Sequence, residues 1–141
     1  MTHARHLARE AALQTLYLCE IGRTNPADAL EAYFAEHGAE LDDEARAFTH
    51  ELVVGTVADQ AAIDRLIGEH ARNWRLERIA VIDRLVLRLA IGELRHRPDT
   101  PAAVVIDEAL ELARTFSGDD AVKFVNGVLD AVRKTLERPN P

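Results

Sequence analysis

The chain has 141 residues, 48% of them hydrophobic, and a formal net charge of −7 at pH 7. That length suits one compact domain with a buried core, and the hydrophobic fraction excludes an intrinsically disordered chain. There is no apolar run of about 18 residues and no apolar signal core near the start, so we expect a cytoplasmic protein without a membrane span. The single cysteine, Cys19, excludes an internal disulfide.

Apolar residues recur at helical spacing along the whole chain, and glycines or prolines separate the periodic segments. Asn25-Pro26 is typical of a helix N-cap followed by proline at the first helical position. Acids at 42–44 favour the positive end of a helix dipole. The pattern predicts helices over about 4–20, 25–37, 42–57, 61–71, 78–97, 100–117 and 119–136.

Residues 78–97 are apolar around most of a helical circumference, which is typical of a buried core helix. Charges inside this segment, at Asp83, Arg84, Arg88 and Glu93, exclude a bilayer span. Pro98 is expected to end it, because the residue before a proline is disfavoured in the helical region. We therefore expect other helices to pack against this one on several sides.

The absence of an alternating Val, Ile and Thr pattern predicts an all-α protein with about seven helices. We expect a single domain over 1–141, built from two small helical sub-bundles at about 1–73 and 74–137. Within the last helix, Gly127 lowers the helix propensity, which indicates that another backbone packs closely against it. Its neighbour Asn126 is expected to hydrogen-bond inside the core.

Positive charge is concentrated in two short segments of this acidic chain. Residues 1–9 contain Arg5, Arg9 and two histidines but no acid, and the segment RNWRLER (72–78) places arginines around Trp74. Such local cationic surfaces allow a modest RNA contact but not bulk coating of nucleic acid. Arg72, Arg75 and Arg78 are therefore further candidate RNA contacts.

Catalytic and metal-binding patterns are incomplete in this sequence. His50-Glu51 begins like a zinc-protease helix motif, but Val54 occupies the position of the second histidine. The two N-terminal histidines lack a third ligand. Cys19 lies on an apolar stripe without an adjacent base, which favours a small buried residue, and no Gly-rich loop precedes a helix to bind a nucleotide. We expect no catalysis, no metal and no cofactor.

The stretch FSGDDAVKFVNGVLD (116–130) has a phenylalanine on either side of a short turn. In one interpretation, Phe116 and Phe124 stack an unpaired base, while Lys123 and the free N–H groups of the last helix hold a phosphate. In the other, both phenylalanines belong to the core and Asp119 is only a helix cap. The residues by themselves favour the second interpretation.

Three parts of the chain resemble the NusB family of bacterial transcription antitermination factors: AREAALQTLYLCEIG (8–22), RIAVIDRLVLRLAIGEL (78–94) and the run from 101 to 130. The most specific pieces are VIDEALELA (105–113) and KFVNGVLD (123–130). The resemblance extends over about 5–132, although residues 24–73 match only in pattern. It implies two three-helix sub-bundles in one all-α domain.

The resemblance also implies a function and partners. NusB-like proteins pair with NusE, a small-subunit ribosomal protein, and the pair binds the boxA RNA element of ribosomal RNA operon transcripts. The complex then joins RNA polymerase and suppresses premature termination. Members of the family also form homodimers that can mask the RNA surface.

Site residues follow from the resemblance position by position. The implied RNA-binding positions are Arg5, His6, Arg9, Phe116, Asp120, Lys123 and Phe124. The implied NusE contacts are Tyr17, Ile21 and Asp83. Many members begin with three or more consecutive arginines, whereas here Leu7 lies between Arg5 and Arg9. Because fewer phosphate contacts lower both the affinity and its salt dependence, we expect weak RNA binding by the isolated protein, with NusE supplying much of the affinity.

Two other functions are compatible with the sequence. A NusB-like domain precedes the catalytic module of small-subunit rRNA cytosine methyltransferases, but this chain ends at Pro141 just after the domain, so we expect no enzyme. A protein-interaction or dimerisation module without RNA binding is the other, suggested by an acidic first half with 5 basic and 13 acidic residues over 1–71. RNA binding in the presence of NusE distinguishes it from the antitermination hypothesis.

Overall fold

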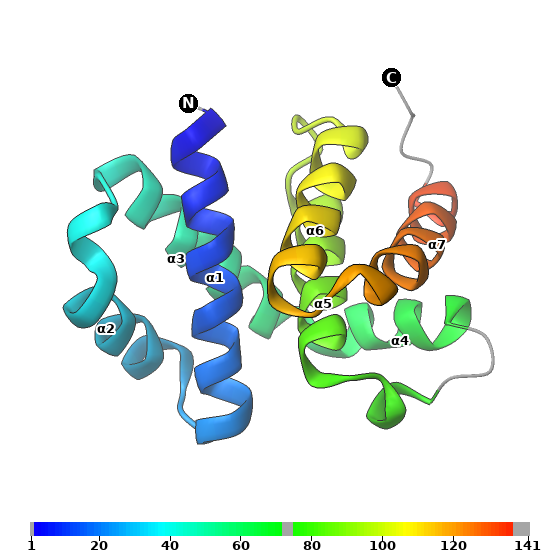
Figure 1. Cartoon of the computed structure of the whole chain (residues 1–141), viewed down its shortest axis with the longest axis horizontal. Coiled ribbons are helices and arrows are strands. Elements are labelled where there is room, and N and C mark those ends of the chain that lie inside the picture. The colour runs from blue at the N-terminus through cyan, green and yellow to red at the C-terminus, as the bar shows by residue number, and fades with distance from the viewer. Residues whose placement is uncertain (1, 72–74, 137–141) are drawn as a thin grey trace. The chain divides into compact units, whose positions relative to one another are not determined.

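The structure is a computed structural model that describes residues 2–71 and 75–136, and in that part of the chain all regular secondary structure is helical (Figure 1). Within these described residues there are seven α-helices and two short 3-10 helices, η1 and η2, which confirms the all-α prediction. The elements in chain order are α1 (Thr2–Gly22), α2 (Pro26–His37), η1 (Gly38–Glu40), α3 (Asp43–Ala58), α4 (Gln60–His70), η2 (Leu76–Arg78), α5 (Val81–His96), α6 (Ala102–Phe116) and α7 (Asp119–Thr135). Among the described helices, none combines the length and the hydropathy needed to cross a bilayer.

The chain divides into two compact units, Met1–Ala58 and Asp59–Pro141. The sequence placed the division near Trp74, which lies outside the described residues, whereas the structure places it before α4. The reason is that α4 packs against α5 and α7. Its buried side chains Ile63, Leu66 and Ile67 therefore contribute to the core of the second unit.

In the first unit, α1 packs against α3 and α2. The face of α1 toward this core carries small residues (Ala8, Ala11 and Ala12, all fully buried), which let the helices approach closely. The Thr49 hydroxyl of α3 lies 3.4 Å from the Ala8 carbonyl oxygen. The predicted start of α2 is confirmed: Pro26 is its first residue, and the Asn25 Oδ1 accepts a hydrogen bond from the Asp28 backbone N–H at 2.9 Å.

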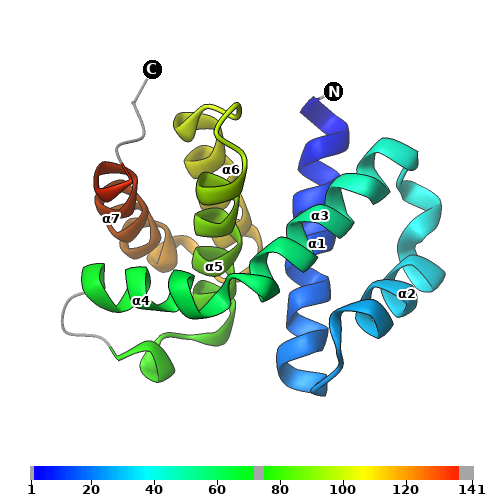
Figure 2. The same cartoon turned by 180° about the vertical axis from the view of Figure 1, so that it is seen from behind.

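In the second unit, α5 is the central helix, as the sequence predicted. It packs against α4, α6 and α7, and Figure 2 shows α4 crossing it on the side opposite α6. Every residue from Arg84 to Leu94 is buried. The buried Arg88 forms a two-pronged pair with Asp64 of α4, Nε to Oδ1 at 2.8 Å and Nη2 to Oδ2 at 3.1 Å, so its charge is compensated inside the core.

Two expectations about α7 are wrong. Gly127 is exposed, and a Cβ atom built on it would meet nothing within 4 Å, so no backbone packs against it. Asn126 is also exposed and does not lie in the core. The helix buries Val125, Val128 and Val132 instead, which leaves 126 and 127 on the solvent side.

Candidate nucleic-acid interface

The arginines at the start of α1 lie over an aromatic ring of α3. The guanidinium carbons of Arg5 and Arg9 are 4.7 and 5.4 Å from the centroid of the Phe48 ring, because an i, i+4 spacing puts both side chains on one helix face. Arg9 is only 4% exposed. A phosphate contact by Arg9 would require its guanidinium to leave this packing, whereas Arg5 is only half-buried.

Acidic groups border the same end of α1. The half-buried His6 has its Nε2 3.4 Å from the Glu10 Oε2. Beside them, a cavity of about 330 Å³ is lined by His3 and Leu7 of α1 and by the acids Glu40 and Asp42. These carboxylates reduce the positive potential of the N-terminal segment, which fits a weak attraction for phosphate.

The C-terminal half of α1 presents an apolar surface. Tyr17, Leu18 and Ile21 are 40%, 38% and 55% exposed. The sequence comparison with the family singled out Tyr17 and Ile21 and missed Leu18, although its i, i+3 spacing from Ile21 places both on one face. Nearby, partial burial raises the pKa of the Cys19 thiol, which disfavours the reactive thiolate.

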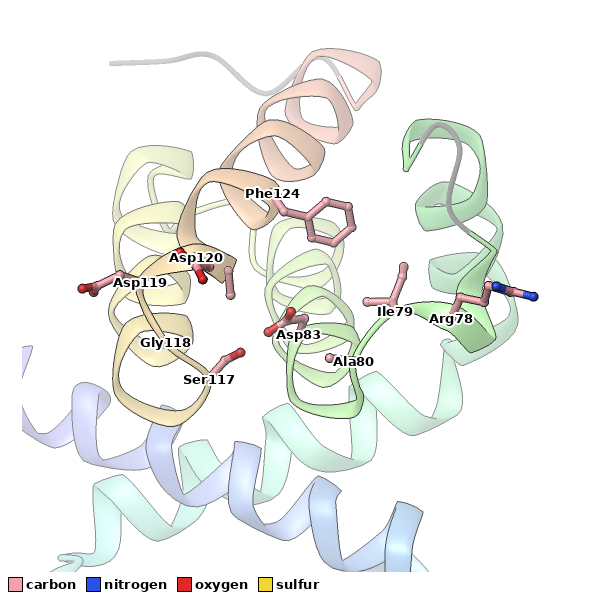
Figure 3. Close-up of a pocket in the computed structure, with 10 residues that line it drawn as sticks. Arg78, Ile79, Ala80, Asp83, Ser117, Gly118, Asp119, Asp120 and Phe124 are labelled. Carbon is pink, nitrogen blue, oxygen red and sulfur yellow. The ribbon is translucent and has the colours of Figure 1, made fainter.

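A pocket of about 640 Å³ lies in the second unit where the η2–α5 connection meets the α6–α7 turn (Figure 3). It contains two of the predicted RNA-binding residues, Asp120 and Phe124, together with Asp83, which the resemblance assigned to a protein partner. Phe116 is half-buried and Lys123 is exposed, and neither lines the pocket. The complete lining is Arg78, Ile79, Ala80, Asp83, Ser117, Gly118, Asp119, Asp120, Ala121 and Phe124.

A glycine turn and a buried arginine side chain each position one wall of this pocket. Gly118 has φ of 147°, a region that favours glycine, and it ends α6 by donating its N–H to the Ala113 carbonyl at 2.9 Å. On the other wall, the buried Arg84 donates from Nη1 to the carbonyls of Leu76 and Ile79 at 3.4 and 3.3 Å. The arginine thereby holds the η2–α5 connection in place.

The polar groups of the pocket are mostly acceptors. The side chains of Asp83 and Asp120 bring carboxylates, and Arg78 is the basic residue of the lining. The exposed Asp119 carboxylate points away from the pocket (Figure 3) and lies 3.8 Å from the Arg114 Nε. The Asp83 Oδ1 is buried and has no hydrogen-bond partner within the described part of the chain. An unpaired buried carboxylate oxygen is costly, and it needs an explanation.

Other predicted features lie elsewhere or outside the structure. Arg72 and Trp74 of the second basic segment fall outside the described residues, while Arg75 and Arg78 are exposed. Within 2–71 and 75–136, no group of three or more His, Cys, Asp or Glu side chains is arranged to hold a metal ion. The sequence missed Ile79 and Ser117, because neither carries a charge or belongs to a recognisable motif.

Comparisons with known proteins agree on one family. A NusB family model matches residues 6–134. The Myxococcus xanthus transcription antitermination protein NusB is 46% identical over 138 residues, which cover 96% of this chain and 99% of that protein. The structure of T. maritima NusB aligns with a TM-score of 0.85 at 35% identity, covering 92% of this chain and 90% of its own. A chain from a crystal structure of the antitermination factors NusB and NusE with double-stranded RNA aligns with a TM-score of 0.88 at 27% identity, covering 96% and 99%.

Proposed function

The chain belongs to the NusB family, a family of antitermination factors and not of enzymes, and we propose that it binds boxA RNA of ribosomal RNA transcripts jointly with NusE. The pair acts within an RNA polymerase antitermination complex in the cytoplasm. The observation that carries the proposal is the alignment over 96% of this chain with one chain of a NusB–NusE–RNA structure. No catalytic step is part of this role.

The RNA contact of the second unit centres on the start of α7. Phe124 offers a ring for stacking an unpaired base, and the exposed Lys123 beside it offers a charge for phosphate. Asp120 lies at the rim of the same pocket. Phe116, half-buried at the end of α6, is a further contact for RNA. This set is compact because it comes from a single turn and the helix that follows.

The contacts of the first unit are of two kinds. Arg5 and His6 reach RNA as secondary contacts, and Arg9 contributes mainly by packing under Arg5 on Phe48. The exposed apolar surface of Tyr17, Leu18 and Ile21 binds NusE. A homodimer is a competing assembly, because exposed apolar patches of this kind mark protein interfaces.

Fluorescence anisotropy of a labelled boxA-like RNA tests the proposal. An equimolar mixture of this chain and NusE binds the boxA-like RNA tightly, with a higher affinity than for a scrambled RNA. The chain alone binds the RNA weakly, and its affinity depends only slightly on the salt concentration. Lys123→Ala lowers the affinity several-fold and reduces the salt slope by about one. The matched control is Lys134→Ala, an exposed lysine of the same helix that pairs with Asp130 at 3.3 Å, and it leaves the affinity unchanged.

A second candidate function is a protein-interaction module without RNA binding. The observation that favours it is the low availability of positive charge in the first unit, where Arg9 is buried and acids line the adjacent cavity. Equal affinities for boxA-like and scrambled RNA, measured while NusE is shown to be bound, would favour this second function. They would exclude the proposed RNA contact.

A further inference from the structure

The start of α1 places two guanidinium groups over a single aromatic ring of α3. Arg5 and Arg9 lie about one helical turn apart, and their guanidinium carbons are 4.7 and 5.4 Å from the centroid of the Phe48 ring. The two arginines differ in burial, because Arg9 is 4% exposed whereas Arg5 is only half-buried. Arg5 is therefore the member of this stack that a ligand can reach.

The ring under these arginines has a fixed position relative to α1. Phe48 is 5% exposed, so its side chain is enclosed by its neighbours. The next residue of α3, the buried Thr49, has its hydroxyl oxygen 3.4 Å from the Ala8 carbonyl oxygen of α1 and 2.7 Å from the Ala45 carbonyl oxygen of its own helix. Because close-packed interiors deform little, the ring is a rigid support for a side chain that stacks on it.

Arg5 retains its hydrogen-bond donors for a ligand. A guanidinium carries five N–H donors in one plane, and stacking on a ring leaves most of them available. No carboxylate of residues 2–71 or 75–136 forms an ion pair with Arg5. The neighbouring His6, in contrast, has its Nε2 3.4 Å from the Glu10 Oε2. A phosphate group, with several acceptor oxygens, matches the donors of Arg5.

We infer that Phe48 is a positioning residue for RNA binding: without touching the RNA, its ring holds the Arg5 guanidinium where it meets a phosphate of the bound strand. A free arginine side chain samples many rotamers, and ordering them on binding lowers the affinity. Stacking on Phe48 restricts these rotamers before RNA arrives. Since residues 1–9 contain only two arginines, the orientation of the accessible one carries more weight. The inference rests on the proposed function, which supplies the RNA.

A purely structural role of Phe48 is the competing explanation, in which the ring only fills the core of the first unit. The two roles differ for a variant that keeps an apolar side chain but removes the aromatic face. Phe48→Leu is such a variant, because leucine remains apolar and of similar size but offers no ring for a cation–π contact. A structural role predicts that its effect on RNA binding is independent of Arg5, whereas a positioning role requires Arg5.

The test is a double-mutant cycle on the full chain, read as the affinity of its complex with NusE for a boxA-like RNA. Phe48→Leu weakens binding about fivefold in the chain that has Arg5, as expected for releasing one rotamer-rich side chain. In the Arg5→Ala background the same change weakens binding by less than about twofold. The matched control, Val53→Ala at a fully buried residue of α3, destabilises the core but leaves the RNA affinity unchanged. Urea unfolding and NusE binding of each variant are measured in parallel.

The outcomes separate this inference from the proposed function. Equal losses for Phe48→Leu in both backgrounds, or an equal loss for Val53→Ala, show that the ring acts only through the fold, and they overturn the inference. An unchanged RNA affinity of Arg5→Ala, with weaker NusE binding, assigns Arg5 to a carboxylate of the protein partner and also overturns it. In each of these cases the proposed function stands. Wild-type protein that does not distinguish boxA-like from scrambled RNA overturns both.

Discussion

Two phenylalanines, one in each unit, lie near basic side chains and have opposite environments. Phe48 of α3 is 5% exposed and is covered by Arg5 and Arg9, so its ring serves the packing of the first unit. Phe124 of α7 is half-buried at the wall of an open pocket. An aromatic ring beside arginine or lysine is thus no evidence of nucleic-acid binding until its accessibility is known.

The comparison also separates two kinds of arginine. In the first unit, arginines stack on a core ring, and the cost of burying their charge is offset by that ring. In the second unit, the buried Arg84 holds a loop carbonyl pair and so shapes the pocket wall. Neither is a simple phosphate contact, so the number of arginines in the sequence overestimates the positive surface available to RNA.

The largest expected effect is on stability. Phe48→Ala removes the buried ring under both arginines and should lower the free energy of unfolding by about 3–5 kcal/mol, as for other buried phenylalanines. Urea unfolding followed by circular dichroism measures it. A loss below about 1 kcal/mol would contradict the view that Phe48 is a core residue.

The second largest effect is expected for Phe124, the phenylalanine of the second unit. Phe124→Ala should weaken RNA binding by the complex with NusE by about 1–3 kcal/mol, the range found for removing an aromatic stacking partner. The unfolding free energy should change less than for Phe48→Ala, because Phe124 is only half-buried. Anisotropy and urea unfolding on the same samples test both parts. An unchanged RNA affinity would remove Phe124 from the interface.

A smaller effect distinguishes the two stacked arginines. Arg9→Ala should destabilise the fold by about 1–2 kcal/mol through lost cation–π and stem packing. Arg5→Ala should cost less than about 1 kcal/mol but should reduce RNA affinity more than Arg9→Ala, because Arg5 is more exposed. The reverse ranking in the RNA titration would show that Arg9 leaves Phe48 on binding.

The smallest expected effect depends on pH and lies in the second unit, outside the pocket. Hydrogen bonds from Arg95, and then from His96 at 2.8 Å, hold the pKa of the Asp59 carboxyl below its usual value. A lowered pKa in the folded state stabilises the protein above the ordinary aspartate pKa, and this stability is lost as the pH falls through the folded value. Asp59→Asn should therefore destabilise by less than about 1 kcal/mol at pH 7.

Urea unfolding of Asp59→Asn and wild type at pH 7 and in acid checks the sign. The difference between them should shrink as the pH falls below about 4, near the ordinary aspartate pKa. A constant difference across that range would mean that the carboxylate charge is not what stabilises this contact. RNA binding at pH 7 should be unaffected, since Asp59 does not line the pocket.

Much of the fold could be predicted from local signals. The N-cap pair Asn25-Pro26 starts α2 as expected, and the apolar circumference of residues 78–97 corresponds to the buried helix α5. The predicted start of α5 was less accurate. The helix begins at Val81, because residues 76–78 form a 3-10 turn and Arg84 binds the carbonyls of Leu76 and Ile79. A contact of that kind has no signature in the periodicity.

The errors at Asn126 and Gly127 have a simple cause. A glycine within a helical period indicates either close packing or an exposed position that tolerates it, and the spacing from Val125, Val128 and Val132 places both residues away from the buried stripe. A helical projection of α7 would have found this from the sequence. The position of Leu18 beside Tyr17 and Ile21 could have been found in the same way.

The sequence by itself determined the helical class, the order of the helices, the central helix and the family, because these depend on periodicity, caps and motifs that are local or contiguous. Only the tertiary structure decided that α4 packs with α5, that Arg9 stacks on Phe48, and that Asp83 and Phe124 share one pocket. Each of these facts joins residues far apart in the chain. Accessibility and shared pockets arise from long-range packing, which a local pattern does not encode.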